Sequence, residues 1–395
     1  MSLVTQLNFD ILSAIYTMLD ARSLLPLAIT SRFVRDTIIP QFLYVRVRLK
    51  TESSARSFYH CLLSGGTAVG CVVRYFELSF LIEGWSCEEF PSLEVAGMLA
   101  EMLEQMSQLR SVKLALHGDL LSYTPRIYKA LVSQTSLRDL ILNYPFGHTF
   151  PPPPLPPFRD LRDLKSLRSF HAIFSPHTAV VVSSQSDFGA ILLNSRNTLE
   201  ELTLPRLRWG FEIPTPGLQP SHASVGGDPV SWPRVRRLSV GPLDNLDLSC
   251  TFPSARYFSA RNSISSLLGE SSNQPFFARL ESMEGLIGDL KSALAAGAAL
   301  RRIAINNLTE VDDFRDLLTP RLHSLRLNMQ ASFHAPSDYF DSLAEMAPSL
   351  KFLRIALWPA HYVYPRPLIS AKILLQLHPN SPLNSSDSNT ISMIT

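Results

Sequence analysis

Residues 7–20 of the chain read LNFDILSAIYTMLD, and their apolar side chains recur at the spacing of an amphipathic helix. The recurring positions are Leu7, Ile11, Leu12, Ile15, Met18 and Leu19. Asn8 or Asp10 can cap the N-terminus of this helix, because both side chains accept hydrogen bonds from free backbone N–H groups. Asp20 follows as the predicted cap of a second helix.

Two more short helices are predicted directly after this stretch. The second covers residues 23–29, with Pro26 near its first turn, where a missing N–H costs little. The third covers residues 31–38, and Pro40 closes the group. Three such small helices bury too little surface to be stable alone. Their apolar side chains must therefore pack against a partner, against the rest of the chain, or against both.

The order of residues in these helices resembles an F-box. The matching elements of the family pattern are the opening Leu7-Asn8-Phe9-Asp10, the step Leu19-Asp20, the pair Leu24-Leu25 and the start of the third helix, Thr30-Ser31-Arg32-Phe33. Asn8 stands where the family usually has Pro, and Val34 stands where it usually has Trp. The alternative interpretation is an ordinary amphipathic helical cap on a larger domain.

The composition excludes several classes of protein. The chain has 395 residues, of which 46% are hydrophobic and 18% charged, as in folded globular proteins. A net charge of +2 gives no support for binding nucleic acid or a membrane through bulk charge. The four cysteines show neither metal-type spacing nor a disulfide framework. With no signal peptide and no membrane-spanning run, we expect a cytoplasmic or nuclear protein.

From about residue 43 the chain repeats a six-residue pattern, apolar-x-x-apolar-x-apolar. Good copies begin at Val73, Leu109, Leu137, Leu199, Val235, Leu300, Leu322 and Leu350, and weaker copies begin near Leu167 and Ala255. Most are preceded by a helical stretch, as in leucine-rich repeats, where a short parallel strand alternates with a helix. The Asn or Cys that usually follows the pattern is absent.

The sequence therefore predicts an α/β fold: a leucine-rich-repeat-like solenoid whose strands, including one near Val45, form one parallel sheet in chain order. A doubly wound parallel sheet is the alternative. We place the F-box-like helical unit at residues 1–42, the degenerate solenoid at 43–378 and a disordered tail at 379–395. Residues 151–157 are predicted to form a stiff polyproline loop, with a docking peptide as the alternative, and residues 205–233 a long loop.

No pattern of catalytic or metal-binding residues is present. The chain lacks a phosphate-binding Gly loop, a Gly-x-Ser-x-Gly elbow and a His-Glu-x-x-His motif. His171 falls in a repeat strand, where an ordinary packed or exposed histidine is expected. We therefore expect no catalytic residue, no metal and no cofactor.

Residues between the apolar positions of each repeat should face away from the core. In the C-terminal half they include Arg237, Arg302, Arg326, Phe352 and Arg354. Arginine and aromatic side chains often anchor protein interfaces, so these five residues are the candidate target-binding site. A solvated basic face without a ligand is the alternative.

Together, the F-box-like helices and the repeats resemble fungal F-box/leucine-rich-repeat proteins. The resemblance implies a non-catalytic substrate receptor of a Skp–cullin–F-box ubiquitin ligase. Its partners would be the Skp adaptor, through it a cullin, and an unidentified protein target. The adaptor-binding residues would be Leu7, Ile11, Ile15, Leu19, Leu24 and Leu25. The alternative function is a repeat-domain scaffold whose F-box does not engage the ligase.

Overall fold

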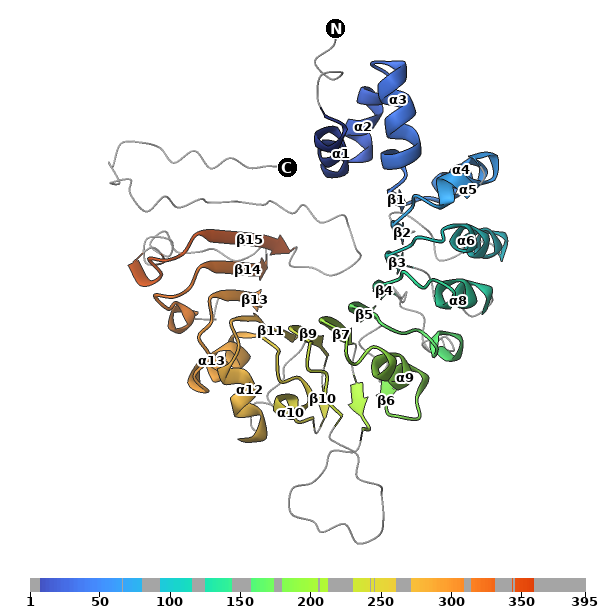
Figure 1. Ribbon diagram of the computed structural model, residues 1–395. Coiled ribbons are helices and arrows are strands. Elements are labelled where there is room, and N and C mark those ends of the chain that lie inside the picture. Colours follow the sequence, from blue (N-terminus) through green and yellow to red (C-terminus); the bar gives the residue numbers. More distant parts are fainter. Residues whose placement is uncertain are drawn as a thin grey trace, which may run out of the picture. The chain divides into compact units, whose positions relative to one another are not determined.

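The structure of the chain is a computed structural model, shown in Figure 1. It describes residues 8–65, 67–79, 93–115, 125–143, 158–173, 180–204, 207–211, 230–241, 243–244, 246–260, 271–308, 314–330, 343 and 345–358. The predicted polyproline segment and the predicted C-terminal tail lie outside these residues. The chain divides into two compact units, the first Met1–Thr178 with Gln185–Leu199 and the second Ala179–Ser184 with Glu200–Thr395.

The first unit begins with three helices, α1 (Phe9–Met18), α2 (Ala21–Ala28) and α3 (Arg32–Ile38), followed by the short π-helical turn η2 (Ile39–Leu43). Side chains cap all three helices: Asn8 accepts from the backbone N–H of Asp10, Asp20 from that of Ser23, and Ser31 from that of Val34. Helix α2 begins two residues earlier than predicted. Pro26 therefore lies inside the helix and not in its first turn.

The main sheet has twelve parallel strands in chain order. The first unit contributes β1 (Arg46–Leu49), β2 (Tyr75–Ser79), β3 (Ser111–Ala115), β4 (Asp139–Asn143) and β5 (Ser169–Ile173). The second contributes β7 (Glu201–Leu204), β9 (Arg237–Val240), β11 (Tyr257–Ala260), β12 (Ser282–Gly285), β13 (Arg302–Leu308), β14 (Ser324–Gln330) and β15 (Phe352–Trp358). The predicted order is confirmed. It differs from a doubly wound sheet, whose strand order reverses at a switch point, and is compatible with a solenoid-like α/β fold.

Neighbouring strands align their buried side chains in rows. In the first unit Leu140 of β4 pairs in register with Val112 of β3 and Phe170 of β5, and all three are buried. The backbone makes the same kind of contact before β2 to β5, β9 and β11 to β15. For example, the carbonyl oxygen of Arg110 accepts hydrogen bonds from the N–H groups of Arg138 (2.8 Å) and Asp139 (2.9 Å). These bonds extend the pairing beyond the strands themselves.

Helices cover one face of the strands in each unit (Figure 1). In the first unit they are α4 (Glu52–Gly65), α5 (Thr67–Gly70), α6 (Leu93–Gln105), α8 (Pro125–Val132), η3 (Phe158–Leu161) and α9 (Asp187–Asn194). In the second they are α10 (Leu248–Thr251), η4 (Ser271–Asn273), α12 (Gln274–Ala278), α13 (Ile287–Ala295) and η5 (Arg315–Leu317). Gly297 follows the C-cap of helix α13, and its φ of 94° suits a residue without a side chain.

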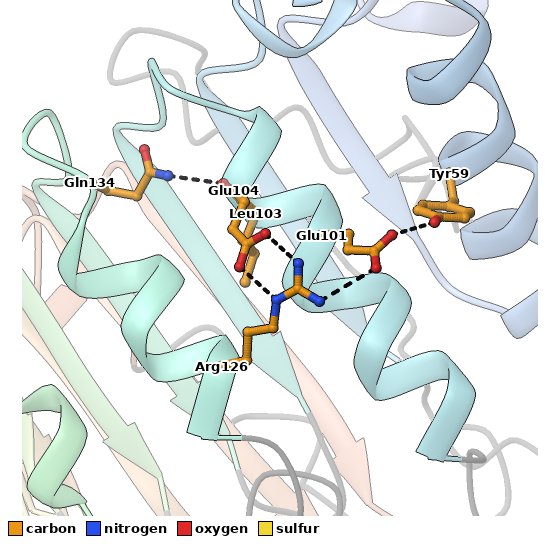
Figure 2. Close-up of polar contacts among 6 residues, drawn as sticks. All are labelled: Tyr59, Glu101, Leu103, Glu104, Arg126 and Gln134. Atoms are coloured by element: carbon orange, nitrogen blue, oxygen red, sulfur yellow. Dashed lines mark hydrogen bonds and ion pairs between the residues drawn. The ribbon is translucent and has the colours of Figure 1, made fainter. Parts of the chain in front are cut away.

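Polar contacts join the helices of the first unit, as Figure 2 shows. Arg126 on α8 binds Glu104 on α6 with two bonds of 2.6 and 2.8 Å, and it also contacts Glu101 at 3.4 Å. Glu101 in turn accepts a hydrogen bond from the hydroxyl of Tyr59 on α4. After α8, the side chain of Gln134 donates to the backbone carbonyl of residue 103 at 2.9 Å. Helices α4, α6 and α8 are therefore linked by side chains.

The sequence prediction missed one strand of the main sheet, β12. Its repeat reads Leu280-x-x-Met283-x-Gly285, so a glycine takes the third apolar position. The first two residues are nevertheless buried, and Gly285 pairs in register with Ile305 of β13. Because glycine has no apolar side chain, this copy does not fit the pattern of three apolar positions.

The prediction of a long loop over residues 205–233 was wrong in part. Residues Leu207–Trp209 form β8, which pairs with β6 (Val180–Val182) and β10 (Leu243–Asp244) in a separate parallel sheet. Trp209 contacts Phe211 and Trp232, with ring centroids 4.9 and 5.5 Å away, and Trp232 is fully buried. Aromatic packing stabilises this part of the second unit.

Replacing Leu140 with Ala should lower the free energy of unfolding by about 2–5 kcal/mol, because the side chain is fully buried in the rows of the sheet. Leu63→Ala is the control, since Leu63 is 52% exposed on α4 and its truncation should cost about 0.5 kcal/mol or less. Urea unfolding measures both. Equal effects of the two changes would contradict the assigned core.

Arg126→Gln should lower the free energy of unfolding slightly at neutral pH, because it removes an exposed ion pair with Glu104. The hydrogen bond from Arg126 holds the pKa of Glu104 below its ordinary value. A depressed native-state pKa stabilises the fold above the unfolded-state pKa, and this stabilisation is lost as the pH falls through the native-state pKa. The difference in unfolding free energy between wild type and Arg126→Gln should therefore become smaller at acidic pH.

The matched control is Arg159→Gln, because Arg159 is exposed and has no ion pair in the described part of the chain. Denaturant unfolding of the three proteins across acidic and neutral pH measures the differences. A gap between wild type and Arg126→Gln that widens in acid would contradict the assigned ion pair.

Candidate functional site

The three N-terminal helices have a hydrophobic core of their own. Its buried members are Leu12, Tyr16, Leu24, Ala28, Val34 and Ile38. Phe42, in the turn after α3, packs its ring edge-on against that of Tyr16 at 5.4 Å between centroids. Val34, at the position where an F-box usually has Trp, is thus a core residue of this group. We call residues 8–43 the helical unit.

The helical unit also exposes many apolar side chains. On α1, Ile11 and Ile15 are 50% and 40% exposed, and Met18 follows on the same side of the helix because residues three and four apart share a face. On α2, Leu25 and Ile29 are exposed four residues apart. Phe9 and Phe33 are exposed as well. The core of this small unit is already filled by other side chains. Its exposed apolar side chains therefore form a candidate docking surface.

The six predicted adaptor-binding residues differ in how far they are exposed. Ile11, Ile15 and Leu25 are exposed, as a docking role requires. Leu24 is only 2% exposed and belongs to the internal core, and Leu19 is half-buried against the same core. Leu7 lies outside the described residues. Leu24 is therefore removed from the candidate docking surface, and Met18 and Ile29, which the prediction did not include, join it.

The second candidate surface is the inner face, by which we mean the side of the strands that points away from the helices. It carries the first and third residues of each strand, in rows set by the register. In the first unit its charges are compensated within the row. Glu77 of β2 lies between Arg48 of β1 (3.0 Å) and Lys113 of β3 (2.6 Å), and Arg46 lies over the ring of Tyr75 at 5.2 Å.

On the inner face of the second unit, Arg237 is also compensated. It pairs in register with Glu201 of β7 and Tyr257 of β11. Its guanidinium lies 3.1 Å from the carboxylate and 5.3 Å from the centre of the tyrosine ring. Since its charge is already paired inside the protein, Arg237 has less to gain from binding an anionic group of a target.

The remaining predicted target-binding residues lie on the last three strands. Arg302 of β13 is exposed between two serines, and Phe352 at the start of β15 is 55% exposed. Arg326 of β14 and Arg354 of β15 are directly opposite each other in register, and both are partly buried. No ion pair of Arg302, Arg326 or Arg354 occurs in the described part of the chain. Three arginines and an aromatic side chain thus share three adjacent strands.

Outside these two surfaces, the described polar side chains do not form a metal-binding cluster. No three of the described His, Cys, Asp and Glu side chains are placed to hold a metal ion. The Nε2 atom of His171 shares a 2.7 Å hydrogen bond with the hydroxyl of Ser169 on the same strand. Cys61, Cys71 and Cys250 are free thiols, and Cys87 lies outside the described residues. Within the same residues, no helix is both long enough and apolar enough to cross a membrane.

Comparison with known proteins does not assign the chain to a family. No model of a known protein family matches its sequence, and no curated protein gives a significant match. The functional interpretation therefore rests on the two surfaces described above: the exposed apolar side chains of the helical unit and the arginines of the inner face.

Leu24 and Leu25 provide a direct test of the helical unit, because adjacent residues have opposite environments there. Leu24→Ala should destabilise α1–α3 by about 2–5 kcal/mol and speed amide hydrogen exchange in residues 9–43. Leu25→Ala should leave exchange nearly unchanged, since that side chain is 51% exposed. Hydrogen exchange read by mass spectrometry gives both results. Equal protection in the two variants would contradict the assigned core.

Proposed function

We propose that the chain is a non-catalytic substrate receptor of a Skp–cullin–F-box ubiquitin ligase. In this function the helical unit is an F-box that binds the Skp adaptor, and through it a cullin. The strands and helices that follow are degenerate leucine-rich repeats, and their inner face binds a protein target. The chain itself carries out no reaction, since ubiquitin is transferred by other subunits.

The observation that carries the proposal is the pair of exposed isoleucines, Ile11 and Ile15, on a helix whose Leu12 and Tyr16 already fill a core. Burying an exposed apolar side chain of this size gains about 1.5–3 kcal/mol. Together with Met18, Leu25 and Ile29, these side chains provide ample apolar area for a partner. The same segment carries the residue order that resembles an F-box.

The arrangement of the strands supports the second half of the proposal. Twelve parallel strands in chain order present their first and third residues as successive rows on the inner face. Repeat proteins use such extended faces to bind other proteins. The arginines of β13–β15 and Phe352 are residue types that anchor such interfaces. This surface is the proposed target-binding site.

The alternative function is a repeat scaffold whose helical unit does not engage the ligase. Two departures from the F-box pattern favour it: Asn8 in place of Pro and Val34 in place of Trp. Asn8 performs the capping role at the start of α1, and Val34 fills the core of the helical unit. Both residues therefore have a structural role that leaves the exposed stripe of α1 intact. Co-purification with the Skp adaptor separates the two functions.

Replacing Ile11 and Ile15 with Asp should abolish pull-down of the Skp adaptor, because two charges would be placed in an apolar interface. Pull-down of the purified full chain by immobilised adaptor is the measurement. Ser13→Asp with Thr17→Asp is the matched control: the same helix and the same i, i+4 spacing, but on the opposite side of α1. The control variant should bind the adaptor like wild type.

Circular dichroism of each variant establishes that α1–α3 remain folded. Adaptor binding that survives Ile11→Asp with Ile15→Asp would rule out this surface as the docking site. A wild-type chain that does not bind the adaptor at all would favour the scaffold function.

A further inference from the structure

The basic residues of the inner face differ in the neighbours that they have within their rows. On strands β1, β3 and β9 three of them have an acidic partner inside the protein: Arg48 and Lys113 share Glu77, and Arg237 pairs with Glu201. In every case the partner is the residue next to the cation in the row. At the end of the sheet, by contrast, the residue next to Arg326 is Arg354.

These two arginines lie close together without an acid between them. Adjacent strands are about 4.8 Å apart, so the two side chains start at that separation. On its other side Arg326 has Ala304 in register, which cannot compensate its charge. Two like charges opposite each other on neighbouring strands are unfavourable. The described part of the chain supplies no carboxylate within ion-pair distance of either.

The hydrogen bonds of the two guanidinium groups leave donors available. The Nε of Arg326 donates to Asn328 at 3.1 Å, and Asn328 in turn donates to Asn306 at 2.7 Å, so this side chain is held from one side. The Nε of Arg354 is buried and has no hydrogen-bond partner among the residues that the structure describes. A buried donor without a partner is uncommon in proteins, and a bound ligand is one way in which such a donor is satisfied.

We propose that Arg326 and Arg354 bind one anionic group of the target, a carboxylate or a phosphate monoester, which would compensate both charges as Glu77 compensates those of Arg48 and Lys113. This inference rests on the function proposed above and names the chemistry of its target. Guanidinium groups pair with both kinds of anion through two parallel hydrogen bonds, and both anions have the oxygen atoms to bridge two arginines.

Phe352 provides an apolar contact for the target next to the proposed anion site. It precedes Arg354 by two residues on the same face of β15, which corresponds to about 7 Å along an extended strand. Its ring is exposed, unlike the aromatic side chains of the core. An extended target segment has the same two-residue spacing on one face. The segment should therefore carry an apolar side chain two residues from the anionic one.

Capped peptides of the form Ser-Leu-Ala-X-Ala-Leu-Ser test this directly, since leucine lies two residues from X in both directions. X is Glu, phosphoserine, Gln or Ser, and titration calorimetry with the full chain measures binding. The Glu or phosphoserine peptide should bind at least about tenfold more tightly than its neutral counterpart, because charge-assisted bidentate pairs are strong. Binding of phosphoserine alone identifies a phosphorylated target; binding of Glu as well identifies an acidic one.

Arg326→Gln with Arg354→Gln should remove this preference. The matched control is Arg46→Gln with Arg237→Gln, which removes two positive charges from the inner face where each guanidinium lies over a tyrosine ring. The control should keep the preference. Arg326→Lys with Arg354→Lys retains the charge without the planar fork and should bind the anionic peptide several-fold more weakly than wild type. Thermal unfolding shows whether each variant is folded. If the glutamine variant does not fold, the lysine variant serves as the test of the site.

Equal binding of charged and neutral peptides, or a preference that survives Arg326→Gln with Arg354→Gln, would overturn the inference. So would a single-stranded oligonucleotide that displaces the peptides, since it would point to a different class of ligand. Adaptor pull-down by the Arg326→Gln, Arg354→Gln variant keeps this test separate from the proposed function. If wild type binds the adaptor but prefers no anionic peptide, the anion site is wrong and the receptor function stands.

Discussion

The in-register pairing of parallel strands is the constraint on which the rest of the structure depends. Leu325 of β14 lies between Ile303 and Leu353, and Arg326 follows on the opposite face. A slip of one residue would turn every leucine of a strand out to solvent and bring a residue such as Arg326 into the core. Both consequences are costly, so the buried rows fix the register. The same register then determines which polar side chains are neighbours on the inner face.

This constraint explains how well the repeats could be predicted from the sequence. Each strand needs two or three apolar residues at fixed spacing, and that requirement is visible in the chain without knowledge of its neighbours. The strand at β12 was missed because Gly285 lines up with Ile305 yet contributes no side chain to the pattern. The short strands β6, β8 and β10 have two or three residues each, too few to show a period. Trp209 of β8 packs against Trp232, and this contact depends on the fold.

The helical unit shows a second limit of periodicity. Its first helix has apolar residues on two sides, and the sequence does not say which side is covered. Ile11 and Leu12 are equally hydrophobic neighbours in the predicted stripe, but only Leu12 packs into the core with Tyr16. Leu24 and Leu25 divide in the same way on α2. Contacts between helices make this choice, and it is the choice that separates a docking residue from a core residue.

The charges of the inner face depend on contacts between repeats. That Arg237 would face away from the core was predictable from its own strand. Its pairing with Glu201, 36 residues earlier in the chain, follows only from the adjacency of β7 and β9. Arg326 and Arg354, by contrast, face each other in register on neighbouring strands, and two like charges placed in this way repel each other. One anion between them converts that repulsion into two attractions, whereas a neutral group leaves it in place. Selectivity for a charged target therefore follows from the cost of the unliganded pair as well as from the bonds that an anion forms.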